Sequence, residues 1–104
     1  MSLRQARAKA KLAREQLVRV QGAVSAEDPE DAVTWAFYAC ENAVVAAAER
    51  EGLSWKPTHV SKQQVASALH KSNVLSRDVS ATLQELNELR KDVAYGDVGK
   101  VWKP

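Results

Sequence analysis

The spacing of apolar residues near the N-terminus constrains the fold of this chain more than any other feature. Between residues 3 and 24 they recur every three or four positions without interruption, which is the repeat of an amphipathic α-helix with one packed stripe. The members of this stripe are Leu3, Ala6, Ala10, Ala13, Leu17, Val20 and Val24. A helix of this kind packs its stripe against a partner, so the sequence predicts a helical domain.

The segment after residue 28 carries the signals of a second helix. Pro29 suits the first helical position, the acids of residues 27–31 complement the positive end of the helix dipole, and Gly52 suits a left-handed cap. The sequence therefore predicts a helix from near Pro29 to about Glu51. Its apolar side chains point in most directions around the helix, which is typical of a buried helix. We expect it to be the central element.

Two shorter helices complete the predicted architecture. Ser61 and Gln64 have the spacing of a capping box for a helix over about residues 62–72. Ser76 is the expected cap of a final helix that stops at Gly96. The apolar stripe of this final helix is Val79, Leu83, Leu86, Leu89 and Val93.

Four helices with short connections bury their stripes most simply as an antiparallel up-and-down four-helix bundle, so the predicted fold class is all-α. Four glycines in 104 residues are too few for the many turns of a β-sandwich. Residues 1–96 form one predicted domain, and residues 97–104 form a short tail.

The composition also argues against several kinds of site. Cys40 is the one cysteine, so it forms no internal disulfide, and with the scattered His59 and His70 it makes no plausible zinc site. We expect no cofactor, ordinary histidines, and a core position for Cys40 with no neighbour that lowers its pKa. No targeting segment is visible, and the apolar stretch 32–48 is too short and polar to span a membrane. The expected location is cytoplasmic.

Charge is distributed unevenly along the chain. Residues 1–24 carry six basic side chains and one acid, whereas residues 25–52 carry seven acids and one base. One line of basic residues lies a single step from the apolar stripe of the first helix. Its members are Arg4, Arg7, Lys11 and Arg14. Such an edge is either a nucleic-acid-binding surface that tracks phosphates or a solvated flank that keeps the protein soluble.

A carboxylate, Glu41, interrupts the apolar middle of the second helix. A buried carboxylate needs a partner. On the wheel of the last helix, Arg90 lies within about 60 degrees of Leu86 and Val93, so its stem belongs to the packed flank. We expect Glu41 and Arg90 to pair, either as a structural ion pair that fixes helix register or as part of a functional site.

Two segments resemble HEPN domains, a family of small helical bundles. Residues 36–43 have the aromatic, small and polar pattern that the family shows on an early helix. Residues 86–96 contain Arg90, which matches the arginine of the late helix in that family. In HEPN domains a histidine follows this arginine a few residues later. Tyr95 stands in its place here.

The resemblance implies a homodimer whose late helices form a shared cleft and, in active members, a metal-independent endoribonuclease. It implies that Arg90 contacts phosphate, Glu41 orients Arg90, Tyr95 donates a hydrogen bond or proton, and Asp92 is auxiliary. Because a phenol titrates near pH ~10, Tyr95 is a poor base, and we expect RNA or nucleotide-related binding with weak or lost cleavage. The resemblance also suggests a nucleotidyltransferase partner protein in a toxin-antitoxin pair.

A different function is also open. Residues 65–79 resemble a helix-turn-helix, with Asn73 at the turn and the final helix as the DNA-reading helix. Glu85 and Glu88 on that helix would repel phosphate. DNA binding is therefore the alternative to the RNA-directed function.

Overall fold

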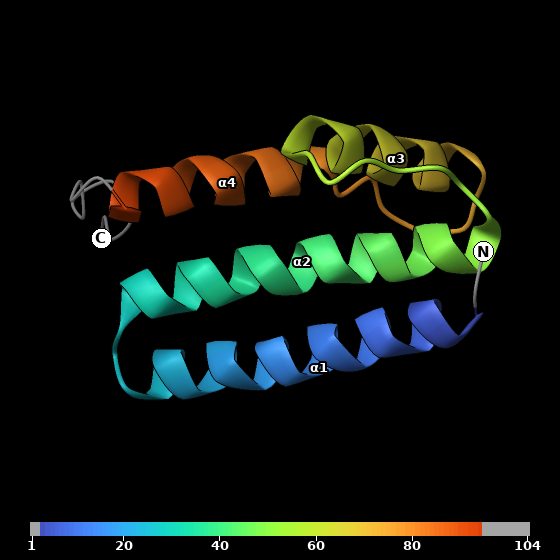
Figure 1. The fold of residues 1–104 in the computed structure, drawn as a ribbon. Coiled ribbons are helices and arrows are strands. Elements are labelled where there is room, and N and C mark those ends of the chain that lie inside the picture. Colours follow the sequence, from blue (N-terminus) through green and yellow to red (C-terminus); the bar gives the residue numbers. More distant parts are fainter. Residues whose placement is uncertain (1–2, 95–104) are drawn as a thin grey trace.

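A computed structural model describes residues 3–94 of the chain (Figure 1). These residues form four α-helices and no strand, which confirms the all-α class. The helices are α1 (Leu3–Ser25), α2 (Pro29–Glu51), α3 (His59–Lys71) and α4 (Ser80–Ala94). The predicted end of the last helix at Gly96 and the predicted tail lie outside the described residues.

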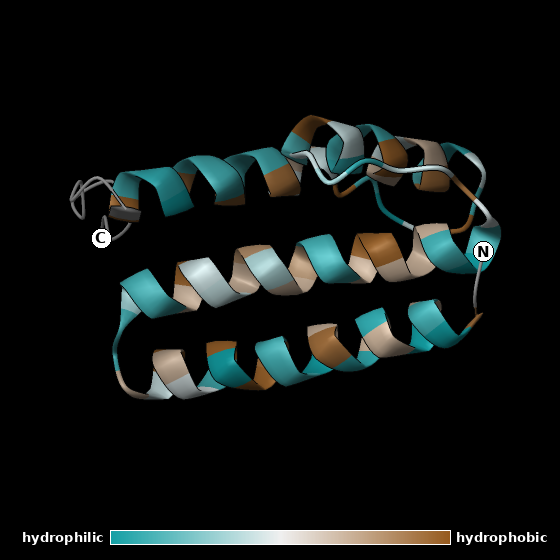
Figure 2. Cartoon of the chain, viewed as in Figure 1, coloured by the Kyte–Doolittle hydropathy of each residue, from teal (hydrophilic) through white to brown (hydrophobic). Residues whose placement is uncertain are grey.

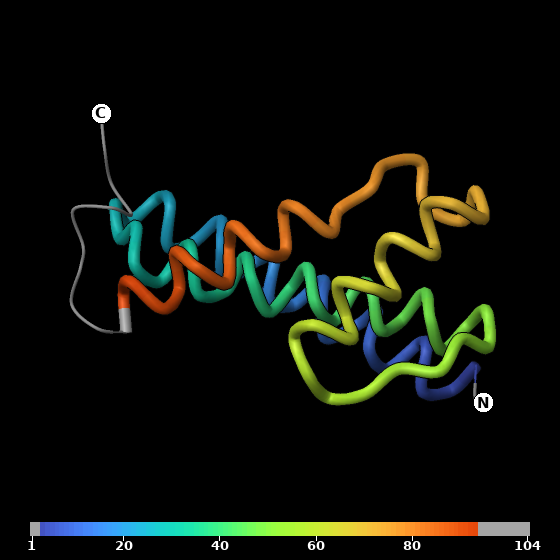
Figure 3. The backbone as a smooth tube through the Cα atoms, turned by 90° about the horizontal axis from the view of Figure 1, so that it is seen from above, coloured from blue at the N-terminus to red at the C-terminus, as the bar shows by residue number. Residues whose placement is uncertain are grey.

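The helices are arranged in three layers with α2 in the middle (Figure 1). α1 packs along α2 on one side, and no Cα atom of α1 lies within 8 Å of α3 or α4. On the other side, α3 runs obliquely toward the C-terminal end of α2, and α4 runs back toward its N-terminal end (Figure 3). This arrangement differs from the expected up-and-down order, because residues 52–58 return along α2 before α3 begins.

Local capping signals explain where the helices begin and end. Asp28 caps α2 by accepting a hydrogen bond from the backbone N–H of Asp31, and Gly52 closes it in the left-handed conformation with φ 79°. Both ends of α2 match the prediction. α3 begins earlier than predicted, because its cap is Thr58, whose hydroxyl accepts from the backbone N–H of Ser61.

The start of α4 also differs from the prediction. The helix begins at Ser80 rather than near Ser76. The carboxylate of Asp78 accepts hydrogen bonds from both the backbone N–H and the hydroxyl of Ser80, and these bonds lower the pKa of Asp78. Asp78 thus supplies the hydrogen-bond acceptor at the start of α4, the role that the sequence interpretation assigned to Ser76.

The apolar stripe of α1 is only half covered. Ala6 and Ala13 are buried against α2, whereas Leu3, Leu17 and Val24 are each more than half exposed. The prediction that the whole stripe packs was therefore wrong. The line of Leu3, Leu17 and Val24 is exposed, and the line of Ala6 and Ala13 is packed. α1 has one neighbouring helix instead of two, so only the alanine line finds a partner.

The main core lies between α2, α3 and α4. Phe37, Leu69 and Leu83 are its largest fully buried side chains, one from each of these helices. The interface between α1 and α2 is built differently, because it contains a partly buried hydrogen bond from the Asn42 side-chain amide to Gln16 Oε1 at 2.9 Å. Within residues 3–94, no helix has the length and apolar character needed to cross a membrane.

Two glycine substitutions test the helix assignments. Gly22 lies inside α1, where an added Cβ atom would meet no heavy atom within 4 Å, so Gly22→Ala is expected to raise the free energy of unfolding by about 0.5 kcal/mol. Gly52→Ala is expected to lower it by about 1 kcal/mol, because the backbone there is left-handed. Urea denaturation measures both, and equal effects of the two variants would contradict the assignment.

Candidate functional site

The carboxylate of Glu41 is the most deeply buried charge among the described residues. The residue is 5% exposed in the middle of α2, where Figure 2 shows a hydrophilic band between apolar stretches. Its Oε2 lies 2.8 Å from Nδ1 of His59, and its Oε1 accepts from Nζ of Lys62 at 3.3 Å. Both partners come from the first turn of α3. The expected need for a partner is confirmed.

The expectation that Arg90 pairs with Glu41 was wrong. Its guanidinium lies over the ring of Phe37, 5.0 Å from the ring centre, and its Nη2 donates to Oδ1 of Asn87 at 2.8 Å. The physical reason is position: α4 covers the N-terminal half of α2, so Arg90 meets Phe37, one turn before Glu41. The first turn of α3 occupies the place beside Glu41 instead.

The ring of Phe37 contacts both His59, the partner of Glu41, and Arg90. The Phe37 ring and the His59 ring form a T-shaped pair with 5.2 Å between centres, while Arg90 Cζ lies 5.0 Å from the centre of the Phe37 ring. The aromatic ring is 1% exposed and therefore acts as a rigid support for both. We call this group the junction cluster. It comprises Phe37, Glu41, His59, Lys62, Asn87 and Arg90.

Exposure within the junction cluster is graded from the carboxylate outward. The side chain of Glu41 is 7% exposed, that of Lys62 is 18% exposed and that of His59 is 45% exposed. A carboxylate only accepts hydrogen bonds, so the hydrogen of this contact belongs to Nδ1 of His59. The other ring nitrogen, Nε2, is then left able to accept a proton. The geometry is that of a partly exposed imidazole held through Nδ1 by a buried acid.

One atom of Arg90 is not satisfied. Its Nε is buried and makes no hydrogen bond to any described residue. The stacking on Phe37 and the bond to Asn87 hold the guanidinium in place despite this cost. The arginine is thus half-buried and positioned, as expected, although through different neighbours.

His59 is a residue of the junction cluster that the sequence interpretation took for an ordinary histidine. It was assigned to a connection, because Ser61 rather than Thr58 was taken as the cap of the third helix. Two signals could have found it. A threonine at position 58 is a good cap, and His59 and Lys62 are three residues apart, so a helix starting at residue 59 places both on one face.

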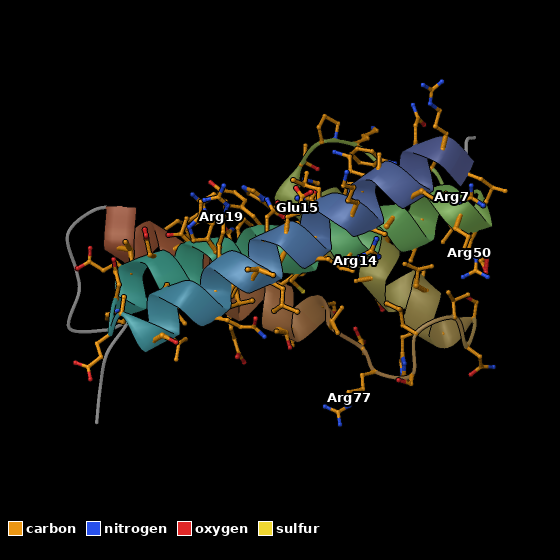
Figure 4. The ribbon with its side chains drawn as sticks, turned by 90° about the horizontal axis from the view of Figure 1, so that it is seen from below. Arg7, Arg14, Glu15, Arg19, Arg50 and Arg77 are labelled. Atoms are coloured by element: carbon orange, nitrogen blue, oxygen red, sulfur yellow. The ribbon has the colours of Figure 1, made fainter. Side chains whose placement is uncertain are left out.

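The other predicted site residues lie apart or outside the described part of the chain. Asp92 is half-buried in the last described turn of α4, and Tyr95 lies outside the described residues. The basic edge is exposed on α1, two layers from α3 and α4, and Figure 4 shows Arg7 and Arg14 on that helix. The structure therefore does not bring the basic edge to the junction cluster.

The segment between α3 and α4 bears on DNA reading. It spans residues 72–79, whereas a helix-turn-helix joins its helices by a turn of about three or four residues. Asn73 adopts a positive φ of 64°, a conformation that asparagine tolerates in turns. No observation on α4 favours insertion into a DNA groove, since Leu83 and Asn87 face the protein interior.

Metal-ligating chemistry finds little support in residues 3–94. No three His, Cys, Asp or Glu side chains of that range gather closely enough to hold a metal ion. Cys40 is partly buried, and burial together with the neighbouring charge of Glu41 raises the pKa of its thiol. This agrees with the expectation that nothing near Cys40 lowers its pKa.

Comparisons with known proteins identify no relative. No protein-family model matches the chain, and neither a curated protein nor a solved structure matches it.

The junction cluster predicts a specific loss of stability. Glu41→Gln removes the charge that Lys62 and His59 face, so we expect the free energy of unfolding to fall by roughly 1–3 kcal/mol. The matched control is Glu85→Gln, an exposed glutamate of α4, which should change it by less than about 0.5 kcal/mol. Denaturant titration compares the two, and a Glu41→Gln protein as stable as the wild type would contradict the described contacts.

The raised pKa of Cys40 predicts slow thiol chemistry. Only the thiolate reacts, and a higher pKa means less thiolate at any given pH, so alkylation by iodoacetamide should be several-fold slower in the native protein than in urea. The native rate should also keep rising at a pH where the rate in urea has levelled off. Mass spectrometry measures both profiles, and superimposable curves would contradict the assigned environment.

Proposed function

We propose that the protein binds single-stranded RNA at the junction cluster and cleaves it slowly without a metal ion, with His59 as the proton-transfer group. The observation that carries this proposal is the 2.8 Å contact between Nδ1 of the exposed His59 and the buried Glu41 carboxylate. An imidazole oriented in this way is the arrangement that general acid–base catalysis uses.

The reaction follows from the chemistry of RNA. Nε2 of His59 takes the proton of a ribose 2′-hydroxyl, and the freed oxygen attacks the adjacent phosphorus. The bond from phosphorus to the 5′-oxygen of the next nucleotide breaks, a 2′,3′-cyclic phosphate forms, and water protonates the departing oxygen. Glu41 holds the imidazole and stabilises its protonated form.

Positive groups beside His59 support phosphate binding. Lys62 is three residues further along α3, and its ammonium has donors beyond the one bonded to Glu41. Arg90 approaches the same ring of Phe37 as His59 does and supplies a guanidinium suited to phosphate oxygens. Negative charge develops on these oxygens during the attack, so fixed cations lower the barrier.

The proposal modifies what the resemblance to HEPN domains implies. In that family the arginine and the histidine belong to one late helix, whereas in this proposal the imidazole comes from His59 of α3, because Tyr95 stands in the sequence where the family has histidine. A single imidazole with no described acid for the leaving oxygen supports slow cleavage. A homodimer and a nucleotidyltransferase partner in a toxin-antitoxin pair remain proposals that rest on the resemblance alone.

Cleavage of a labelled single-stranded RNA in the presence of EDTA tests the function. His59→Gln keeps a donor for Glu41 but loses the proton acceptor, so the rate should fall by roughly 100-fold or more. The matched control is His70→Gln, because His70 bonds to the backbone carbonyl of Leu75 away from Glu41, and its rate should stay within about threefold of the wild type.

Two outcomes would contradict the proposal. One is cleavage that His59→Gln leaves unchanged, which would point to a contaminating nuclease. The other is the absence of any retention of RNA at low salt, where phosphate contacts are strongest. Arg90→Lys tests the proposed phosphate contact, because it keeps the charge but loses the flat guanidinium, and we expect weaker RNA binding from a protein that remains folded.

A further inference from the structure

A long apolar groove runs between α1 and α2 on one side of the hairpin that these helices form. Its central part has a volume of about 470 Å³ and is lined mainly by alanines, with Leu17 and Arg14 at its edge. A second hollow of about 590 Å³ continues it, since both include Ala10 and Ala46, and Val74 and Leu75 of the connection between α3 and α4 border this second hollow. The groove therefore follows the hairpin for much of its length.

Leu3 and Leu17 line this groove, and Val24 continues their line along α1. Leu3, Leu17 and Val24 are each more than half exposed, and they fall, with Ala10, at intervals of seven residues. Seven residues are close to two helical turns, so these side chains share one side of α1. The face thus offers protruding leucine and valine side chains next to hollows at small residues such as Ala43. Protruding side chains beside hollows are the features that allow two copies of one surface to interdigitate.

Charge divides the hairpin along its length. The end where α1 begins and α2 finishes carries Arg4, Arg7 and Arg50, with Arg7 and Arg50 beside the groove together with Glu51 (Figure 4). The opposite end, at the connection between the helices, carries four exposed acids. They are Glu27, Asp28, Glu30 and Asp31. Within residues 3–94, neither these arginines nor these acids take part in an ion pair.

We propose that this face is the interface between two copies of the chain, paired antiparallel about a two-fold axis so that the two hairpins form a four-helix bundle. In this pairing the basic end of each hairpin faces the acidic end of the other, and Leu17 of each enters the alanine-lined groove of its partner. Each helix has 23 residues and is about 35 Å long, which is sufficient for an interface of ordinary size.

A second copy fits the face better than a foreign helix does. An acidic amphipathic helix would complement the arginines but would leave the acids at the other end unmatched, whereas the two-fold axis pairs both ends at once. The interface is also distinct from the late-helix dimer that the HEPN resemblance implies. It uses no residue of the junction cluster, so its failure and the failure of the proposed function are distinguishable.

Sedimentation velocity from low micromolar to several hundred micromolar protein tests the interface. The wild type should be dimeric over much of this range, and Leu17→Lys should weaken the dimer by roughly tenfold or more. Val18→Lys is the matched control, because Val18 is similarly exposed on the same helix but does not line the groove, and it should leave the dimer intact. A wild type that stays monomeric throughout, or equal effects of both variants, would overturn the proposal.

A charge exchange tests the antiparallel register. Arg7→Glu with Arg50→Glu should weaken the dimer several-fold, and adding Glu30→Lys with Asp31→Lys in the same chain should restore it, because each end then meets its complement again. The effect should shrink at high salt. A fourfold variant no tighter than the double variant would overturn the register, and a dimer insensitive to all of these changes would place the interface elsewhere.

Discussion

The burial of one carboxylate governs how three of the four helices are placed. Glu41 sits in the middle of α2 at 5% exposure, and a charge in that position requires donors close by. Both donors, His59 and Lys62, belong to the first turn of α3, so the chain must return from the end of α2 to its middle before α3 begins. The N-terminal half of α2 is then left for α4, which brings Arg90 onto Phe37.

The existence of the four helices and both ends of α2 could be predicted from local sequence signals. Asp28, Pro29 and Gly52 fix both ends of α2 through short-range hydrogen bonds and backbone preferences that a sequence shows directly. The order of the helices in space was not readable in the same way. An apolar stripe such as that of α1 shows which side is able to pack, but the number of neighbours that cover it depends on the paths of connections such as residues 52–58.

The site was only partly predictable for a related reason. A single acid among apolar residues predicts a partner for its charge, and this prediction for Glu41 was correct. Which cationic side chain pairs with Glu41 depends on a tertiary contact between α2 and the start of α3. The assignment of the cap to Ser61 instead of Thr58 moved the helix start by a few residues and left His59 outside the predicted helix, as an ordinary histidine. A small error in a helix boundary thus became a large error in the site.

The layered arrangement has a consequence for how the molecule opens. Among the helices, α1 contacts only α2, through alanines, the Gln16–Asn42 bond and Arg19 over the ring of Trp35, whereas α2, α3 and α4 share the core around Phe37, Leu69 and Leu83. In the isolated chain, α1 can therefore swing away as a unit while the remaining core stays closed. Its amide hydrogens would exchange with solvent through this partial opening, well before those at the centre of α2, which exchange only when the whole domain unfolds.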